Sequence, residues 1–336
     1  MLKKVVTIIC LVCISISLLA GCTGEKDRGT REVVDSLGRN VIIPYDINRI
    51  ASFNTDLTEI IIALGGLDKL VIQDFNSFAG ASWIGKHFPQ LRELPAPYSP
   101  AGFNVEELLN ARPDIIITTS IGTLPFSELE NVQELYGIPV LCFSFQSLDT
   151  YFEELALLSY VIGAGEHGEN ISKFLSDFID SVTERVAHIE EDARVRVYHA
   201  LSNEFRTFGA GIFQESQIRR AGGINVTNEL SGFNILINAE QLYVWDPDII
   251  IMLYEAAPNS FYDNEQLRDL RAVINRNVHR HPEPGWGFLT PRAIFAVKWL
   301  SYHFYPELYT DINIDNEADA FYMKVYNFGR TFVNGQ

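Results

Sequence analysis

Two glutamates occupy the same position in a stretch that this chain carries twice. Asn104 to Ile117 reads NVEELLNARPDIII, and Asn238 to Ile251 reads NAEQLYVWDPDIII, at an offset of 134 residues. Eight of the fourteen positions are identical, among them Glu106 and Glu240. A carboxylate in the first turn of a helix can stabilise the positive helix end, or it can pair with a cation on another molecule. The residue types leave both roles open.

Histidines are the second chemical feature, because imidazole is a common metal ligand. The run HRH places His279 and His281 on one side of an extended segment. No third ligand stands at a recognisable spacing, and bare Zn²⁺ usually requires more nitrogen or sulfur ligands than this pair offers. We therefore predict no metal site built by the protein alone. Completion of a partly chelated metal by His281 or Tyr254 remains a separate possibility.

Motifs of the common catalytic classes are missing from the sequence. It contains no G-x-S-x-G elbow, no G-x-x-x-x-G-K-[ST] loop and no G-x-G-x-x-G that opens a helix after a strand. We therefore expect a protein that is not an enzyme and needs no cofactor. Bilobal chelatase enzymes are the catalytic alternative, because a fold alone cannot exclude catalysis.

The elements that must position these residues follow an α/β pattern. Short runs rich in Ile and Val alternate with amphipathic segments, which predicts parallel sheets covered by helices. The predicted strands are Asn48–Phe53, Lys69–Gln73, Asp114–Thr119, Pro139–Phe145, Arg194–Leu201 and Asp248–Tyr254. The predicted helices are Asp56–Gly65, Asn104–Arg112, Phe213–Gly223 and Asn238–Trp245. Each lobe contains one copy of the repeat, as a helix, a Pro-Asp stop and a strand.

A long amphipathic segment separates the two halves. Its apolar residues fall on one helical stripe: Ile171, Phe174, Leu175, Phe178, Ile179, Val182, Val186 and Ile189. We predict a helix from about Glu166 to Glu191, roughly 38 Å long, that joins two Rossmann-like lobes and resists bending. The predicted divisions are a signal peptide over 1–21, a tether over 22–30, an N-terminal lobe over 31–164, the bridging helix over 165–192 and a C-terminal lobe over 193–336.

The N-terminus predicts export and lipid attachment. Two lysines precede an apolar run from Val5 to Leu19, which is short for a helix that crosses about 30 Å of hydrocarbon. The following LLAGC resembles the lipobox of bacterial lipoproteins, so Cys22 is the predicted lipid attachment site. An uncleaved membrane anchor is the alternative.

The cysteines and the net charge indicate which thiols remain and which kind of partner is excluded. Cys10 and Cys13 leave with the signal peptide, so Cys142 is the remaining thiol and is predicted to be buried. The net charge of −17 becomes −19 once Lys3 and Lys4 are removed. We therefore expect no nucleic-acid partner, because phosphate contacts require clustered Lys and Arg.

The chain resembles the helical-backbone class of ABC-transporter substrate-binding lipoproteins, which bind ferric siderophores, haem, corrinoids and related chelates. The resemblance rests on segments spread along most of the mature chain: Val33–Pro44, Asn48–Val71, the two repeats, Ala221–Val226 and Gly285–Tyr309. It implies a ligand cleft between the lobes, a permease dimer with its ATPase subunits as partner, and an extracytoplasmic site at the cell membrane. It also implies that Glu106 and Glu240 dock with arginines of the permease.

Ligand contacts are predicted where loops follow the strands, since open α/β sheets bind ligands at their carboxyl ends. The candidates are Asn54, Thr55, Phe75, Asn76, Trp83, Ser120, Arg206, Phe208, Tyr254 and Trp286, with Glu255 beside them. Aromatic rings suit a flat or catechol-bearing chelate, and Arg206 suits its negative charge. Each aromatic could instead pack in a lobe core, and Arg206 could lie at a solvated hairpin tip.

Ligand identity stays open at this stage. A ferric siderophore is the first expectation, and a corrinoid, haem, molybdate or tungstate are the alternatives. A surface sensor lipoprotein without a transporter is the remaining class.

Overall fold

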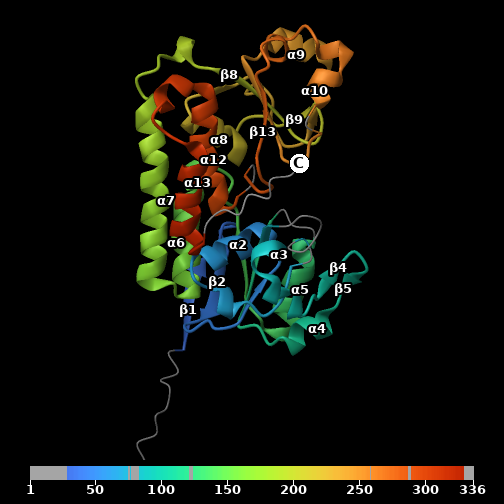
Figure 1. Ribbon diagram of the computed structural model, residues 1–336. Helices are drawn as coiled ribbons and strands as arrows, with labels where there is room; N and C mark the ends of the chain where they lie inside the picture. Colours follow the sequence, from blue (N-terminus) through green and yellow to red (C-terminus); the bar gives the residue numbers. More distant parts are fainter. Residues whose placement is uncertain are drawn as a thin grey trace, which may run out of the picture.

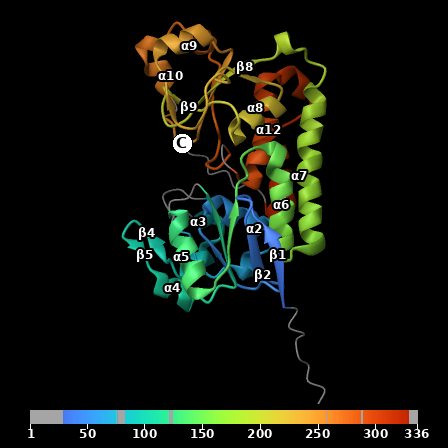
Figure 2. The ribbon, with the colours of Figure 1, turned by 180° about the vertical axis from the view of Figure 1, so that it is seen from behind.

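The computed structural model describes residues 29–74, 76, 83–120, 124–257, 259–286 and 289–328. Two α/β lobes are stacked, and one long helix, α7 (Gly165–Val186), runs beside both (Figures 1 and 2). The predicted fold class is confirmed, with two parallel sheets in one chain. No described helix is both long enough and apolar enough to cross a membrane.

Each lobe is built on a parallel sheet. The N-terminal sheet has the order β3-β6-β7, with β3 (Ile50–Ser52), β6 (Ile115–Thr119) and β7 (Val140–Phe143). The C-terminal sheet has the order β10-β8-β12-β13, with β8 (Arg196–Ala200), β10 (Ile224–Asn225), β12 (Ile249–Met252) and β13 (Val278–Arg280). Three small antiparallel pairs are β1 (Thr30–Val34) with β2 (Asn40–Pro44), β4 (Tyr98–Ser99) with β5 (Gly102–Phe103), and β9 (Arg206–Thr207) with β11 (Ile235–Leu236). The strand predicted over Lys69–Gln73 is reduced to one bridge between Leu70 and Ile50.

Helices cover the sheets. Those of the first half are α2 (Thr55–Ala63), α3 (Trp83–His87), α4 (Val105–Asn110), α5 (Phe126–Tyr136) and α6 (Leu148–Ile162). Those that follow α7 are α8 (Phe213–Arg220), α9 (Ala239–Trp245), α10 (Ser260–Asp263), α11 (Arg271–Ile274), α12 (Pro291–Phe304) and α13 (Ile314–Tyr326).

The bridging helix is shorter than predicted, because α7 ends at Val186 rather than near Glu191. The acidic run Glu190–Asp192 would lie at the negative end of a longer helix, where carboxylates are unfavourable. The apolar stripe is nevertheless the buried face of the helix. Gly168 lets α7 approach α6 closely, since an added Cβ would lie 2.0 Å from the Ser159 hydroxyl.

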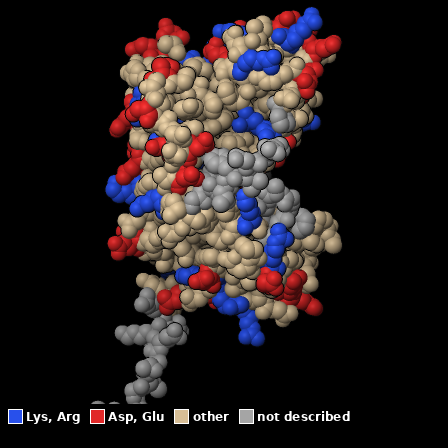
Figure 3. Space-filling model, viewed as in Figure 1, with Lys and Arg blue, Asp and Glu red and all other residues tan. Residues whose placement is uncertain are grey.

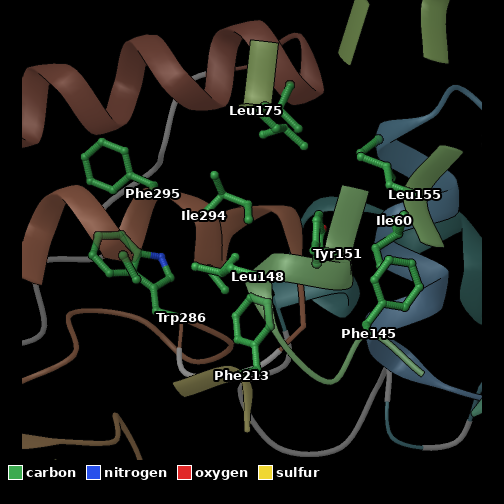
Figure 4. Packing of buried hydrophobic residues seen from close by; sticks show 14 of the residues in the cluster. Ile60, Phe145, Leu148, Tyr151, Leu155, Leu175, Phe213, Trp286, Ile294 and Phe295 are labelled. Carbon is green, nitrogen blue, oxygen red and sulfur yellow. The ribbon is translucent and has the colours of Figure 1, made fainter. Parts of the chain in front are cut away.

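The two lobes share one apolar core. The sequence predicted that a single helix would connect the lobes, and it did not predict this shared core. Helices α12 and α13 follow the C-terminal lobe in sequence, yet both contact α2 of the N-terminal lobe. One buried cluster therefore runs through both lobes, and Figure 4 shows Ile60, Tyr151, Leu175, Phe213 and Phe295 within it. Each sheet also has one smaller apolar cluster against it. A large hinge motion would have to separate close-packed side chains of the shared core.

A buried ion pair crosses the same junction. Glu59 of α2 is 1% exposed and Arg292 of α12 is 3% exposed. Arg292 donates from Nε and Nη2 to the two carboxylate oxygens of Glu59, at 2.8 and 2.7 Å. Tyr326 of α13 donates its hydroxyl to Glu59 at 2.6 Å, and the guanidinium lies 4.3 Å from the ring centroid of Trp83. The pair therefore fixes α12 and α13 to the N-terminal lobe.

Replacing Arg292 by methionine should lower the free energy of unfolding by about 3–5 kcal/mol, because Glu59 would stay buried without its cation. Urea unfolding followed by tryptophan fluorescence measures the change. The matched control is Lys298→Met on the same helix, whose pair with Glu317 spans 2.6 Å but is partly exposed. The control should lose less than about 1 kcal/mol. Equal losses in the two variants would contradict a special role for the buried pair.

Candidate functional site

The carboxyl edge of the N-terminal sheet presents amide, hydroxyl and carboxylate groups. Asn54 caps α2, with its side chain accepting from the Leu57 N–H at 3.0 Å, and its amide nitrogen lies 3.4 Å from the Thr119 hydroxyl. Thr55 donates its hydroxyl to the buried Asp74 at 2.6 Å. Ser120 follows β6 and is exposed. The structure therefore brings Asn54, Thr55 and Ser120 to one edge, as predicted from strand order.

The facing edge of the C-terminal sheet presents an arginine on a tyrosine. Arg280 ends β13 and donates to the Tyr254 carbonyl at 3.1 Å, while its guanidinium lies 5.0 Å from the Tyr254 ring centroid. Glu255 follows and is exposed. Strand alternation explains the geometry: the half-buried His279 and the buried His281 pack against His303 and Trp299 of α12, so Arg280 between them points the other way. The two imidazoles were considered as metal ligands from the sequence, but no sequence pattern marked Arg280 between them.

Three of the predicted aromatic contacts are core residues instead. Phe208 and Trp286 are fully buried, so neither presents a surface to a ligand in this conformation. The Trp286 indole donates to the Tyr322 hydroxyl at 2.9 Å. Trp83 is nearly buried and packs 4.7 Å from the Tyr326 ring. The core alternative of the prediction therefore describes these three side chains, because a core shared between lobes needs large side chains at the junction.

The remaining candidates lie apart or outside the described residues. Arg206 is half-buried on β9, where its guanidinium reaches the Asn234 carbonyl and side-chain oxygens at 3.4 and 3.3 Å. This matches the hairpin alternative more closely than a free anion-binding arginine. Asn76 is exposed. Phe75 and Cys22 lie outside the described residues.

Carboxyl groups at the junction were also missed by the sequence reading. Asp56 lies on the first turn of α2 and accepts a hydrogen bond from the Leu289 backbone across the junction. Burial and the neighbouring Glu59 raise the pKa of Asp56 to about 7. Glu283 accepts from the Tyr322 hydroxyl at 2.8 Å and lies 3.7 Å from Arg292. Periodicity could not reveal this cluster, because its members come from four distant segments.

Two of the histidines, His199 and His281, belong to the core of the C-terminal lobe. His199 and His281 are each 1% exposed, with ring centroids 5.4 Å apart. Neither nitrogen of His281 has a hydrogen-bond partner among the described residues. Burial lowers the pKa of His199 to about 3 and that of His281 well below its ordinary value. No group of three or more potential metal ligands occurs in the described part of the chain.

The repeat is a structural unit used once in each lobe. Asn104 and Asn238 cap α4 and α9, accepting from backbone N–H groups at 3.1 and 2.9 Å. Leu108 and Leu242 are fully buried beneath the helices. The aspartates of the two Pro-Asp pairs accept backbone N–H groups of the adjoining segment, Asp114 from Arg49 at 2.8 Å and Asp248 from Arg196 at 2.9 Å.

Arginines complete the unit in both lobes. Arg49 donates to the Ala111 carbonyl at 2.5 Å, and Arg196 donates to the Trp245 carbonyl at 2.8 Å. Both therefore satisfy carbonyl groups at the end of the repeated helix. The glutamates differ from the other repeated residues: Glu106 and Glu240 are exposed, and neither carboxylate pairs with another described side chain.

Two α/β lobes, each with a parallel sheet and joined by one long helix and by helices packed on both lobes, define the two-lobed fold of periplasmic binding proteins. The match to a family model agrees: residues 50–284 match the periplasmic binding protein family, and the chain belongs to that family. The family serves ABC importers outside the cytoplasm, and the relatives found are transport binding proteins rather than enzymes.

Two curated relatives differ in what they bind. The chain is 23% identical to the molybdate-binding protein MolA of Haemophilus influenzae over 324 residues, covering 88% of this chain and 91% of MolA. It is 25% identical to the vitamin B12-binding protein of Vibrio cholerae over 257 residues, covering 76% of this chain and 88% of that protein.

Solved structures confirm the fold. The MolA structure with bound molybdate has a TM-score of 0.77 at 21% identity, covering 90% of this chain and 99% of MolA. Helicobacter pylori CeuE with bound Ni(II) has a TM-score of 0.73 at 18% identity, covering 89% of this chain and 97% of CeuE.

Charged side chains of both signs lie on the surface of the two lobes. On the face shown in Figure 3, acidic side chains are spread over both lobes, and the described Lys and Arg residues form no continuous stripe.

The buried histidines predict a stability that falls in acid. Their folded-state pKa lies below the value of about 6.5 in the unfolded chain, so below pH 6.5 the unfolded state binds more protons. Each histidine then costs up to about 1.4 kcal/mol per pH unit as the pH falls toward the folded-state value. His281→Leu should therefore flatten the decline in unfolding free energy between pH 6.5 and 5, measured by urea unfolding at each pH.

The exposed His188 supplies the control, since His188→Gln should keep the wild-type slope. An unchanged slope in His281→Leu would contradict the burial of a neutral imidazole.

Proposed function

We propose that this protein captures an organic metal chelate between its lobes and delivers it to an ABC permease dimer with its ATPase subunits. The observation that carries the ligand class is the Arg280–Tyr254 stack at the edge of the C-terminal sheet. A cation on an aromatic face suits a ligand that is both flat and negatively charged. Asn54, Thr55 and Ser120 supply hydrogen-bonding groups from the opposite lobe.

A ferric siderophore is the first ligand we propose within this class. Ferric catecholate complexes combine flat aromatic chelating groups with net negative charge, which the arginine and the tyrosine can meet together. Corrinoid and haem are alternatives with the same flat character, and the vitamin B12-binding relative favours the former. Arg206 could add a second cation if its contact with Asn234 opens.

Molybdate or a similar oxyanion is the second candidate, favoured by similarity to MolA over most of the chain. Charge at the N-terminal edge argues against it. Asp56 and Asp74 lie beside the start of α2, and Arg292, which is buried at the junction, is already bonded to Glu59. A small anion would gain little there, because opposing carboxylates offset the helix end and the arginine.

Arg280→Ala and Tyr254→Ala should each weaken chelate binding by about 1–2 kcal/mol. Tryptophan fluorescence, titrated with ferric catecholate, ferric hydroxamate, cobalamin, haem, molybdate and Ni²⁺, measures affinity and ligand class together.

The control is Arg276→Ala, because Arg276 also lies 5.0 Å from a tyrosine ring, that of Tyr262, at a position away from the sheet edge. Affinity should be unchanged in this variant. Tight binding of molybdate with no response to any chelate would overturn the chelate proposal and leave the oxyanion in its place.

We further propose that Glu106 and Glu240 dock with basic residues of the two permease subunits. The asparagine, leucine and aspartate of each repeat all have a structural contact, whereas the glutamates are exposed at the surface of both lobes. A docking role explains why the carboxylate occurs in both copies.

Glu106→Lys and Glu240→Lys should together abolish uptake, because each would face a cation with like charge. Ligand affinity and stability should change by less than about 1 kcal/mol, since an exposed first-turn charge contributes no more than that. Two measurements separate loss of docking from loss of ligand binding: uptake of the identified ligand by cells, and ligand affinity of the purified variant.

Glu166→Lys is the matched control, because Glu166 is also an exposed first-turn glutamate, on α7. It should leave uptake intact. Normal uptake in the double reversal would mean that the repeat reflects a duplicated folding unit only.

Anchoring through Cys22 is the last part of the proposal, supported by the LLAGC sequence. Cys22→Ser should move the protein from the membrane fraction to the soluble fraction, because the attached lipid supplies the membrane affinity. Immunoblots of fractionated cells measure the shift. Unprocessed native protein in the soluble fraction would contradict lipid attachment.

A further inference from the structure

The exposed face of α9 carries apolar residues beside its glutamate. Val244 is 82% exposed and follows Glu240 by four residues, so the two side chains lie on the same face of the helix. Tyr243 is also exposed. The segment that leads into α9 adds Leu236, which is 67% exposed, and Phe233. Clustered exposed apolar side chains mark interaction surfaces more often than chance exposure does.

The first copy of the repeat lacks this apolar face. At the offset of 134 residues, Val244 corresponds to Asn110 and Leu236 corresponds to Gly102. No described residue between Tyr45 and Leu135 is an exposed large hydrophobic side chain. The shared fold of the repeat therefore does not require apolar residues at these positions.

The helix that carries the apolar face is held firmly. Tyr243 donates its hydroxyl to the Gln266 carbonyl at 2.9 Å, and the Trp245 indole donates to Glu229 at 2.8 Å. Arg196 bonds the helix end at the Trp245 carbonyl. A pre-organised surface loses little conformational entropy when a partner covers it.

The charge of Glu240 indicates which kind of partner can cover this face. A second copy of the chain would bring a molecule of net charge −17 against Glu240, which like-charge repulsion disfavours. A partner with a basic residue next to apolar side chains would satisfy the carboxylate and cover Val244 together.

We propose that the α9 face, made of Leu236, Glu240, Tyr243 and Val244, binds a permease subunit through apolar contacts around the ion pair, whereas the α4 face binds through polar contacts alone. This inference rests on the docking role proposed for Glu240. The two lobes then contribute unequally: the C-terminal lobe supplies affinity that salt does not weaken, and the N-terminal lobe supplies a contact that salt screens.

Photo-cross-linking tests this surface in cells that express the full chain with its own transporter. A benzophenone amino acid replaces Val244, Asn110 or Ile42 in separate strains, and mass spectrometry identifies each product. Asn110 is the exposed counterpart of Val244 on α4, and its replacement leaves Glu106 in place. Ile42 is the control, because it is 66% exposed but lies on β2. We expect permease products from positions 244 and 110 and none from position 42.

The outcomes separate the inference from the proposed function. A permease product at position 110 without one at 244 overturns the apolar face and leaves docking intact. A second copy of this chain at position 244 makes the face a dimer interface and also overturns the inference. No permease product at either position overturns both.

Affinity for the identified permease gives an independent readout. Val244→Asn with Leu236→Thr should weaken binding about tenfold, in low and high salt alike, because the loss is apolar. Ile42→Thr should have no effect. Loss that appears only at low salt would show that the contact is electrostatic and overturn the inference.

Discussion

The buried pair of Glu59 with Arg292 constrains the molecule more than any other single contact. It joins α2 of one lobe to α12 of the other, and Tyr326 and Trp83, whose rings also pack on each other, both contact it. Removing either partner would leave a charge in a place that water does not reach. Because α12 and α13 also pack on α7 and α2, the pair is embedded in an apolar core common to both lobes. The facing sheet edges are therefore held at a set separation.

A fixed separation of the lobes also fixes the distance between the two copies of the repeated helix. The two copies of the repeat place α4 on one lobe and α9 on the other, each with an exposed glutamate. Rigid lobes hold these two points at one distance, which the proposed docking on two permease subunits would require. In the proposed function, Arg280 and Tyr254 at the sheet edge contact the ligand without a large closure of the lobes.

Local patterns predicted much of this structure. Apolar strands followed by capped helices gave both parallel sheets, and the stripe from Ile171 to Val186 gave the bridging helix, because these features depend on neighbouring residues. The carboxyl edge of the N-terminal sheet was predicted in part: Asn54 and Thr55 lie where strand order puts them. Trp286 and Phe208 are buried, which is the core alternative of the prediction, and the sequence could not decide between the two because exposure depends on distant segments. The junction of Asp56, Glu59 and Arg292 could not be predicted, because it joins residues more than 230 positions apart.

The distance between the two lobes is the most direct measurement of this account. Spin labels on Asn110→Cys and Val244→Cys, in a chain that begins at Gly29, report the separation of α4 and α9 by pulsed electron resonance. Cys142 stays unlabelled, because it is buried and burial raises the pKa of its thiol to about 12. The account predicts one narrow distance that ligand leaves unchanged and that Arg292→Met broadens. A broad distribution in the native chain, or a shift above about 2 Å on ligand binding, would contradict it.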